Sequence, residues 1–428
     1  MTSPSTAIIC TAVRVLLALV VTTTPAEGAD SDWSVDLSGQ YRVRVEGYQE
    51  PFVGLSSIDE FTSIAHRLLG GVSLDYKDHY RVFAQFGTFI ENGRKPSARP
   101  TDEGHPDIQQ LYLDFPLSPD NSARKLRFGR QEMSFGASRL VSLRDSPNIR
   151  RSFDALKLTF PWRSMEIQAF VGRPVELLRG AIDDSTDTSV AFWGVYGSAP
   201  LPNDTGLDFY YFGLDRDMST FDQGVAAESR HTVGTRIFGR HSAWNWDGEA
   251  AFQFGKFGDG SIRAWFIGGE VGRTWRDARW SPRLAIRSHV FSGDDDPLDP
   301  DLQTFNPLFP KTTFFTQAGL FSPANAIDLH PLSSLSPAKN LRITMSVDVF
   351  WRFSTDDALY RPPLLPRIPG NANDKRFLGA IWEVSAKWSP TERISVTLAY
   401  DVADARSFIS DAGGKDPRFF LLSAQVSL

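Results

Sequence analysis

Long stretches of the sequence alternate, residue by residue, between apolar and polar side chains. From Trp33 to Val45 the apolar or aromatic residues occupy the odd positions, and the even positions carry polar residues such as Asp36 and Arg42. A period of two is typical of a β-strand with one dry and one wet face. The alternation returns in later stretches, at residues 244–254, 341–353, 378–388, 394–401 and 420–428. We therefore predict an all-β chain.

The lengths of the connections distinguish a membrane barrel from a soluble sandwich, which also alternates. Connections after even-numbered strands are tight, at residues 77–79, 116–123, 161–163, 199–205, 241–243, 276–280, 336–340 and 389–392. Those after odd-numbered strands are long, at residues 50–63, 91–107, 133–151, 173–189, 215–229, 292–324, 354–376 and 403–417, with one tight exception at 258–261.

This arrangement predicts a transmembrane antiparallel β-barrel of about 18 strands, with short periplasmic turns and long extracellular loops. A barrel grows around its circumference, so 428 residues need not be divided into several domains. The least regular of the predicted strands are residues 109–115 and 325–335. We expect the bacterial outer membrane, with its lipid, as the location of residues 30–428.

Residues 1–29 have the pattern of a secretory signal peptide. An apolar run from Val15 to Val21 is followed by small residues ending near Ala29. The apolar run is too short for a membrane helix. The single cysteine, Cys10, lies in this segment, so cleavage removes the only thiol and its chemistry.

The polar strand faces carry many arginines, which suit a water-filled lumen and not lipid. Fixed guanidinium charges in a confined pore would favour anions that carry carboxylates. Alternatively, these arginines pair with inward acids and only tie the wall together. The strand-face arginines are Arg42, Arg44, Arg67, Arg81, Arg127, Arg236, Arg283, Arg287, Arg342, Arg352 and Arg393.

Several motifs resemble the alginate export family of outer-membrane porins. The first group is Arg127-Phe-Gly-Arg-Gln131, residues 135–141 and Arg151-Ser-Phe-Asp154. Later matches are residues 292–296 with 304–310, residues 327–330 and residues 350–357. The resemblance implies an eighteen-stranded monomeric barrel with an electropositive constriction that exports a uronic-acid polymer, and it implies possible periplasmic export partners.

The resemblance assigns the substrate path to the residues in its motifs, which are Arg127, Arg130, Gln131, Arg139, Arg151 and Asp154. Strict alternation from Leu126 and Phe128 would turn Arg130 toward lipid, so a bulge or the onset of a loop is required to bring it inward. The chain ends in Leu428, whereas such barrels usually end in an aromatic residue.

Two other functions are compatible with parts of this pattern. The main alternative is a general or uptake porin for small carboxylate anions. An outer-membrane enzyme is less expected, because the G-x-S-x-G and H-E-x-x-H motifs are missing. Asp294, Asp295 and Asp296 are a weak candidate for calcium, and no other metal or cofactor is expected. The net charge of -6 gives no reason to bind nucleic acid.

Overall fold

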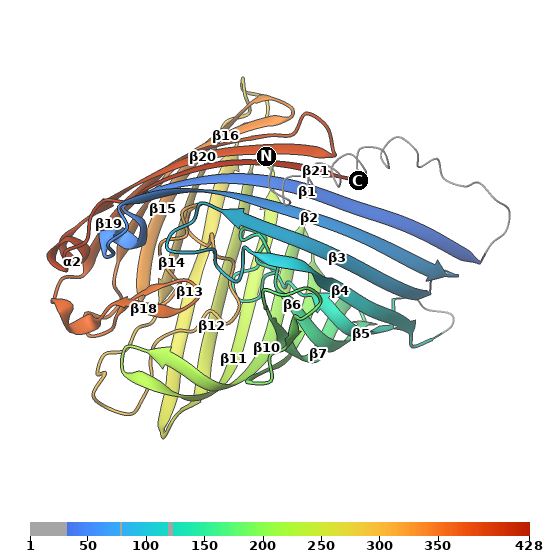
Figure 1. Cartoon of the computed structure of the whole chain (residues 1–428), viewed down its shortest axis with the longest axis horizontal. Helices are drawn as coiled ribbons and strands as arrows, with labels where there is room; N and C mark the ends of the chain where they lie inside the picture. The colour runs from blue at the N-terminus through green and yellow to red at the C-terminus, as the bar shows by residue number, and fades with distance from the viewer. Residues whose placement is uncertain (1–31, 78, 119–122) are drawn as a thin grey trace.

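The computed structural model describes residues 32–77, 79–118 and 123–428. The predicted signal peptide and Cys10 lie outside these ranges. Within them, eighteen strands form one closed antiparallel barrel (Figure 1). The strands are β1 (Trp33–Gln49), β2 (Glu60–Tyr76), β3 (Tyr80–Asn92), β4 (Gly104–Pro116), β5 (Lys125–Glu132), β6 (Ser152–Trp162), β7 (Met165–Glu176), β9 (Val190–Leu201), β10 (Thr205–Phe221), β11 (Gly224–His241), β12 (Trp244–Phe257), β13 (Gly260–Thr274), β14 (Arg283–Phe291), β15 (Ala326–Ala338), β16 (Leu341–Trp351), β19 (Phe377–Trp388), β20 (Ile394–Ala405) and β21 (Arg418–Ser427).

Three shorter strands lie in the loops. β8 (Ser185–Thr186) pairs with the end of β7, and β17 (Leu359–Arg361) pairs with β18 (Leu365–Ile368) inside the loop between β16 and β19. The helical elements are η1 (Pro51–Gly54), η2 (Gly370–Ala372) and α2 (Ser407–Asp411). Among the described residues, no helix is long and apolar enough to cross a membrane.

The barrel closes between its first and last strands. β1 pairs with β2 from Trp33 to Gln49 and with β21 from Gln40 to Gln49. Side chains on the outer face are exposed and apolar, for example Leu284 and Ile286 on β14 and Trp382 on β19. The apolar residues of the alternating pattern thus face outward and the polar ones face the lumen, as predicted. The two least regular strand predictions are also confirmed, as β4 and β15.

The predicted connection lengths hold with one exception. Tight turns join β2 to β3, β6 to β7 and β11 to β12 at one rim, whereas loops of up to 34 residues, as at 292–325, emerge at the other. The predicted long loop at 215–229 is wrong. There β10 and β11 continue to Phe221 and from Gly224, so a two-residue turn joins them. The extension is stabilised because Phe221 packs edge-on against Phe257, with ring centroids 5.3 Å apart.

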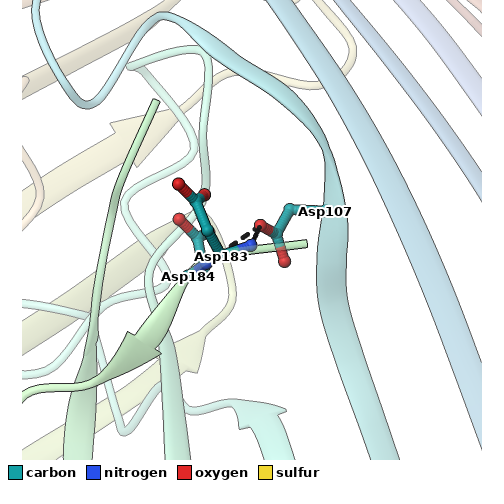
Figure 2. A group of neighbouring side chains, drawn as sticks. All are labelled: Asp107, Asp183 and Asp184. Atoms are coloured by element: carbon teal, nitrogen blue, oxygen red, sulfur yellow. Dashed lines mark hydrogen bonds between the residues drawn. The ribbon is translucent and has the colours of Figure 1, made fainter. Parts of the chain in front are cut away.

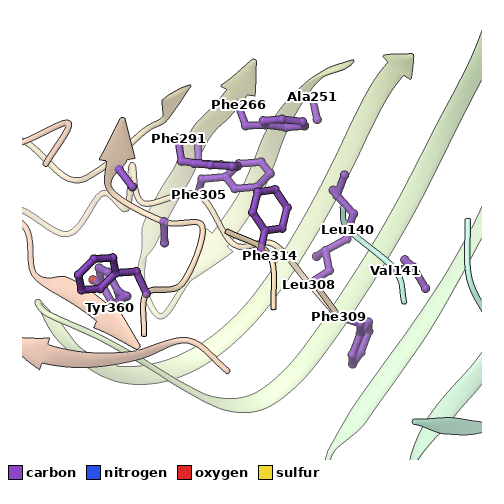
Figure 3. Packing of buried hydrophobic residues seen from close by; sticks show 14 of the residues in the cluster. Leu140, Val141, Ala251, Phe266, Phe291, Phe305, Leu308, Phe309, Phe314 and Tyr360 are labelled. Carbon is purple, nitrogen blue, oxygen red and sulfur yellow. The ribbon is translucent and has the colours of Figure 1, made fainter. Parts of the chain in front are cut away.

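The interior is less polar than the sequence predicts. Phe153, Phe170, Phe192 and Phe212 are buried on inward positions of neighbouring strands β6, β7, β9 and β10. The long loops at 133–151 and 292–325 supply further apolar side chains to the same cluster, among them Leu140, Val141, Phe305 and Phe309 (Figure 3). Apolar loop residues have no water-excluding partner except the inner wall, so these loops fold into the barrel.

Candidate functional site

A cavity of about 330 Å³ lies on the side of the barrel where the long loops emerge, and we call it the loop-side cavity. Its lining comes from the loop-side ends of β1 and β2 and from five loops that connect barrel strands. The charged side chains of this lining are nearly all cationic, and Glu46 is its only carboxylate among the described residues. The cations are Arg44, Arg94, Arg99, Arg144, Arg151, Lys311, Arg361 and Arg367.

Three of these cations are already neutralised. Arg44 and Arg94 both contact Glu46, at 2.6 and 2.8 Å, and Arg99 contacts Asp102 at 2.6 Å. Within the described ranges, the other cations have no carboxylate within 4.0 Å. These unpaired cations are Arg144, Arg151, Lys311, Arg361 and Arg367. The cavity therefore presents positive charge that the wall does not cancel.

A smaller cavity of about 180 Å³ lies nearer the short turns, and we call it the inner cavity. It is lined by Ala137, Arg139, Asp247, Glu270, Arg287, His289, Lys311 and Phe314. Arg139 contacts Asp247 at 2.8 Å, and Arg287 contacts Glu270 at 2.8 Å. Lys311 lines both cavities, so this residue lies between them.

Lys311 lies in the loop between β14 and β15, and its surroundings disfavour its charge. Burial, together with Arg287 and Arg139, lowers the pKa of the Lys311 ammonium to about 8. The side chain lies near the ring of Phe314, 5.8 Å from its centroid. At neutral pH the group is still mostly protonated, but a modest rise in pH removes its charge.

The structure places four of the predicted residues around these cavities. Arg44 and Arg151 line the loop-side cavity, and Arg139 and Arg287 line the inner cavity. Arg151 also donates to the carbonyl of Phe309, which links the loop at 133–151 to the loop at 292–325. Arg139 and Arg151 share the loop at 133–151, which packs near Arg44 of β1 on one side and Arg287 of β14 on the other.

Other predicted arginines support the wall or the loops. Arg42 donates to the carbonyls of Asp145 and Pro147 at 2.6 and 2.8 Å, and Arg67, fully buried, contacts the Asp145 carboxylate at 2.7 Å. Both arginines thus hold the loop at 133–151 against β1 and β2. They line neither cavity.

Toward the short turns the remaining arginines pair with acids on adjacent strands. Arg127 forks onto Asp114 at 2.6 and 2.7 Å. Similar contacts join Arg81 to Asp75, Arg236 to Asp208 and Asp247, and Arg283 to Glu270. Arg342 and Arg393 are exposed near this rim. These contacts match the alternative prediction, in which arginines pair with inward acids and link neighbouring strands of the wall.

Arg352 and Gln131 are fully buried, and neither lines the loop-side or the inner cavity. The Arg352 guanidinium, 0% exposed, donates to the carbonyls of Thr355, Gly370 and Asn373, among others. It therefore organises the loop between β16 and β19. Gln131 donates to the carbonyls of Gly129 and Ala155.

The predicted inward turn of Arg130 is wrong. β5 keeps a continuous register with β4 and β6, and Arg130 shares the outer face with Phe128, which is 60% exposed. Asp154 lies opposite Arg130 in that register and contacts it at 3.0 Å. The loop after β7 covers the pair, since Thr186 donates to Asp154 at 2.7 Å. The ion pair remains outside because no bulge interrupts the alternation.

The acidic residues that could surround a metal ion are not the predicted ones. Asp107, Asp183 and Asp184 bring carboxylate oxygens within 4.8 Å of one another (Figure 2). Asp107 already accepts hydrogen bonds from the backbone N–H groups of Asp183 and Asp184, which ties the loop after β7 to β4. Of the predicted calcium residues, Asp294 is buried and accepts from the Asp296 N–H at 3.2 Å, while Asp295 and Asp296 are exposed.

Most cations of the loop-side cavity were missed by the sequence reasoning. Arg94, Arg99, Arg144, Lys311, Arg361 and Arg367 all lie outside the barrel strands. Period-two alternation identifies only residues on strand faces, and a loop has no such face. The signal that could have found these residues is composition, since long loops rich in apolar and basic residues are expected to fold inward.

Comparisons with known proteins agree with this architecture. The alginate export family model matches residues 34–420. The outer membrane protein OpdK from Pseudomonas aeruginosa has 12% identity and a TM-score of 0.61, over 92% of this chain and 98% of that chain. The structure of OpdK with vanillate has 13% sequence identity and a TM-score of 0.61, over 92% of this chain and 98% of that chain. OccAB1 from Acinetobacter baumannii has 12% sequence identity and a TM-score of 0.61, over 95% of this chain and 99% of that chain.

The search of curated proteins found no match. The similarity to the solved structures concerns the fold, which is that of channel-forming outer-membrane barrels. The family match extends from β1 into β21 and so covers nearly the whole wall. The protein therefore belongs to the alginate export family and is a barrel of the bacterial outer membrane.

Proposed function

We propose that this barrel passes a carboxylate-bearing polysaccharide, of the polyuronate class, through its lumen. The observation that carries the proposal is the set of unpaired cations around the loop-side cavity, Arg144, Arg151, Lys311, Arg361 and Arg367. Cations that already have wall partners would offer little to a passing anion, because their charge is compensated. These five keep their charge available to a solute.

The order of the cavities supports a path. An anion in the loop-side cavity meets guanidinium groups, which fork onto carboxylates and stay charged at any physiological pH. It then reaches Lys311, which also lines the inner cavity, and passes Arg139 and Arg287 toward the short turns. Successive, moderately strong sites allow a chain to be held and released in steps.

A second candidate is passage of small carboxylates. It is favoured by the confined volumes, about 330 and 180 Å³, and by the loops packed inside the barrel. OpdK, whose fold is similar, has been solved with vanillate, itself a small carboxylate. Polymer export requires the loops at 133–151 and 292–325 to shift, whereas small anions need less movement.

Planar-bilayer recordings of the purified barrel test both candidates. For polymer export we expect anion-selective conductance that soluble polyuronate blocks, and a weaker block after Arg144, Arg361 and Arg367 are each changed to Gln. Arg276→Gln, on the exposed short turn between β13 and β14, is the matched control and should leave the block unchanged. Anion selectivity with no polymer block would favour small carboxylates, and cation preference would contradict both.

A further inference from the structure

His289 lines the inner cavity and has one buried ring nitrogen without a hydrogen-bond partner among the described residues. The side chain lies on β14, is 2% exposed, and places Nδ1 at 2.9 and 3.2 Å from the two carboxylate oxygens of Asp328 on β15. A carboxylate only accepts hydrogen bonds, so Nδ1 carries the ring hydrogen. Nε2 of the neutral ring is therefore an acceptor, and it is buried with no hydrogen-bond partner among the described residues.

The ring of His289 is fixed in place by aromatic neighbours. Phe291 stacks on it with centroids 5.7 Å apart, and Phe314 and Phe315 meet it edge-on at 5.1 and 6.4 Å. None of these side chains can donate a hydrogen bond to Nε2. A buried acceptor without a donor costs free energy, so a ligand that supplies a donor gains that interaction.

The charges around the inner cavity leave one positive charge uncompensated. Its lining carries Arg139, Arg287 and Lys311 against Asp247 and Glu270, so three cations face two anions and the sum is +1. The two arginines contact those acids, whereas Lys311 has no carboxylate within 4.0 Å in the described ranges. Asp328 faces His289 from β15 and is occupied by the ring. The cavity therefore lacks one anionic partner.

We propose that the inner cavity selects carboxylates that also carry a hydroxyl group, with Lys311 binding the carboxylate and His289 Nε2 accepting the hydroxyl hydrogen. This inference rests on the proposed passage of carboxylates and specifies which ones bind. A cavity of roughly 150 Å³ holds a benzene-sized ring, so about 180 Å³ accommodates one ring of a uronate or a hydroxy acid. Phe314 supplies an apolar wall beside that ring.

A competing arrangement would have His289 protonated, with Nε2–H donating directly to the carboxylate. A hydroxyl would then bring no advantage, because a bare carboxylate would satisfy both Lys311 and His289. Groups of both signs lie near the ring, since Asp328 contacts Nδ1 and Arg139 and Arg287 line the same cavity. The two arrangements differ in one measurable quantity, the preference for a hydroxylated over a bare carboxylate.

Block of chloride current by D-glucuronate and by cyclohexanecarboxylate measures that preference, since both probes place one carboxylate on a six-membered ring. In the wild-type barrel we expect glucuronate to block at about fivefold lower concentration, the effect of one hydrogen bond. His289→Phe removes the acceptor and keeps an aromatic ring, so the ratio should approach one. Equal block by the two probes in the wild type would overturn the inference.

His330→Phe is the matched control. His330 forms the neighbouring buried pair with Asp348, Nδ1 to Oδ2 at 3.0 Å, but does not line the cavity, so the variant should keep the fivefold ratio. Asp328→Asn is the second test variant, because an amide can either accept from Nδ1–H or donate to Nδ1 and so no longer holds the ring hydrogen on Nδ1. Nε2 is then an acceptor in only part of the molecules, so the ratio should fall.

An unchanged ratio in both His289→Phe and Asp328→Asn would also overturn the inference. The proposed function has a separate readout, the reversal potential in a chloride gradient. If the pore is anion-selective but the two probes block equally, the role of His289 fails and anion passage stands. If the pore prefers cations, the proposed function fails.

Discussion

Arg67 and Arg144 are both arginines, but only Arg67 has a carboxylate partner among the described residues. Arg67, on a strand, contacts Asp145 at 2.7 Å, whereas Arg144, in a loop, lines the loop-side cavity without a carboxylate partner. The sequence indicates that cations are present in the lumen but not which of them are compensated. Pairing depends on contacts between distant segments, so only the folded loops decide which charges a solute can meet.

Lys311 should set the charge selectivity at the junction of the two cavities. We expect Lys311→Gln to lower the anion-to-cation permeability ratio roughly fivefold, since a unit charge at about 4 Å contributes about 1 kcal/mol even in water. Because the pKa of Lys311 is lowered to about 8, its charge is present below that pH and lost above it. The wild-type ratio should therefore fall between pH 7 and 9.

Lys311→Arg is the control for this prediction, because a guanidinium keeps its charge throughout that range. Its permeability ratio should stay constant between pH 7 and 9, as measured by reversal potentials. A wild-type ratio that does not change with pH would contradict the assigned role of Lys311.

Arg352 should control the order of one loop and not the stability of the barrel. Arg352→Lys replaces a fork that reaches several carbonyls of residues 355–375 with a single ammonium group. Each buried carbonyl left without a donor costs about 1 to 3 kcal/mol. We expect faster trypsin cleavage after Arg367, which precedes Ile368, with the heat-resistant gel migration of the barrel unchanged. The exposed Arg376→Lys should show neither effect.

Strands and loops differ in how far the sequence predicts them. The alternation around Arg42 and around Met345 predicts β1 and β16, because a lipid-facing wall requires it at each step. β15 is less regular, since its outward positions include Pro331 and Ser333. Loops carry no such constraint. The apolar residues Phe305 and Phe309 therefore gave no sign, in a strand-based search, that their loop folds inside.

The loop at 292–325 should be held more firmly at acid pH. Burial, with a contribution from Asp357, raises the pKa of Asp294 to about 7, and burial raises that of Asp357 to about 6. Both native pKa values exceed the ordinary value of 3.8, so the folded loop binds more protons than an opened one. The stability that these protonated carboxyls contribute is fully present below pH 3.8 and is lost progressively until pH reaches about 7.

Hydrogen exchange of residues 292–325, corrected for the intrinsic rate, measures this effect at pH 5.5 and 8. We expect weaker protection at pH 8 in the wild type and a smaller pH difference in Asp294→Asn. Asp295→Asn is the control, because Asp295 is exposed in the same loop. Equal protection at both pH values in the wild type would show that Asp294 does not destabilise the closed loop.

For the molecule as a whole, the net charge of -6 conceals an uneven distribution. The acids are spread over rims, turns and wall pairs, while the unpaired cations concentrate around the loop-side cavity. Composition therefore indicated a mildly acidic protein and could not reveal a basic interior. The barrel itself was predictable, because closure and membrane residence are properties of the whole alternation pattern and do not depend on any single residue.

Anion selectivity should decline as salt concentration rises. The Debye length falls from about 10 Å at 0.1 M salt to about 3 Å at 1 M. At high salt, Arg361 and Arg367 would be screened from an ion that does not touch them. We expect a clearly lower permeability ratio at 1 M than at 0.1 M KCl, measured at equal gradients. A ratio independent of salt would mean that selectivity arises from direct contact alone.

The position of Lys311 has a consequence for throughput. Because the same ammonium lines both cavities, solutes on the proposed path must pass it in single file. Each carboxylate must leave before the next one takes its place, so the flux of small anions levels off once this group is continuously occupied. A polymer avoids that limit, since its successive units are covalently joined and each one draws the next past the lysine.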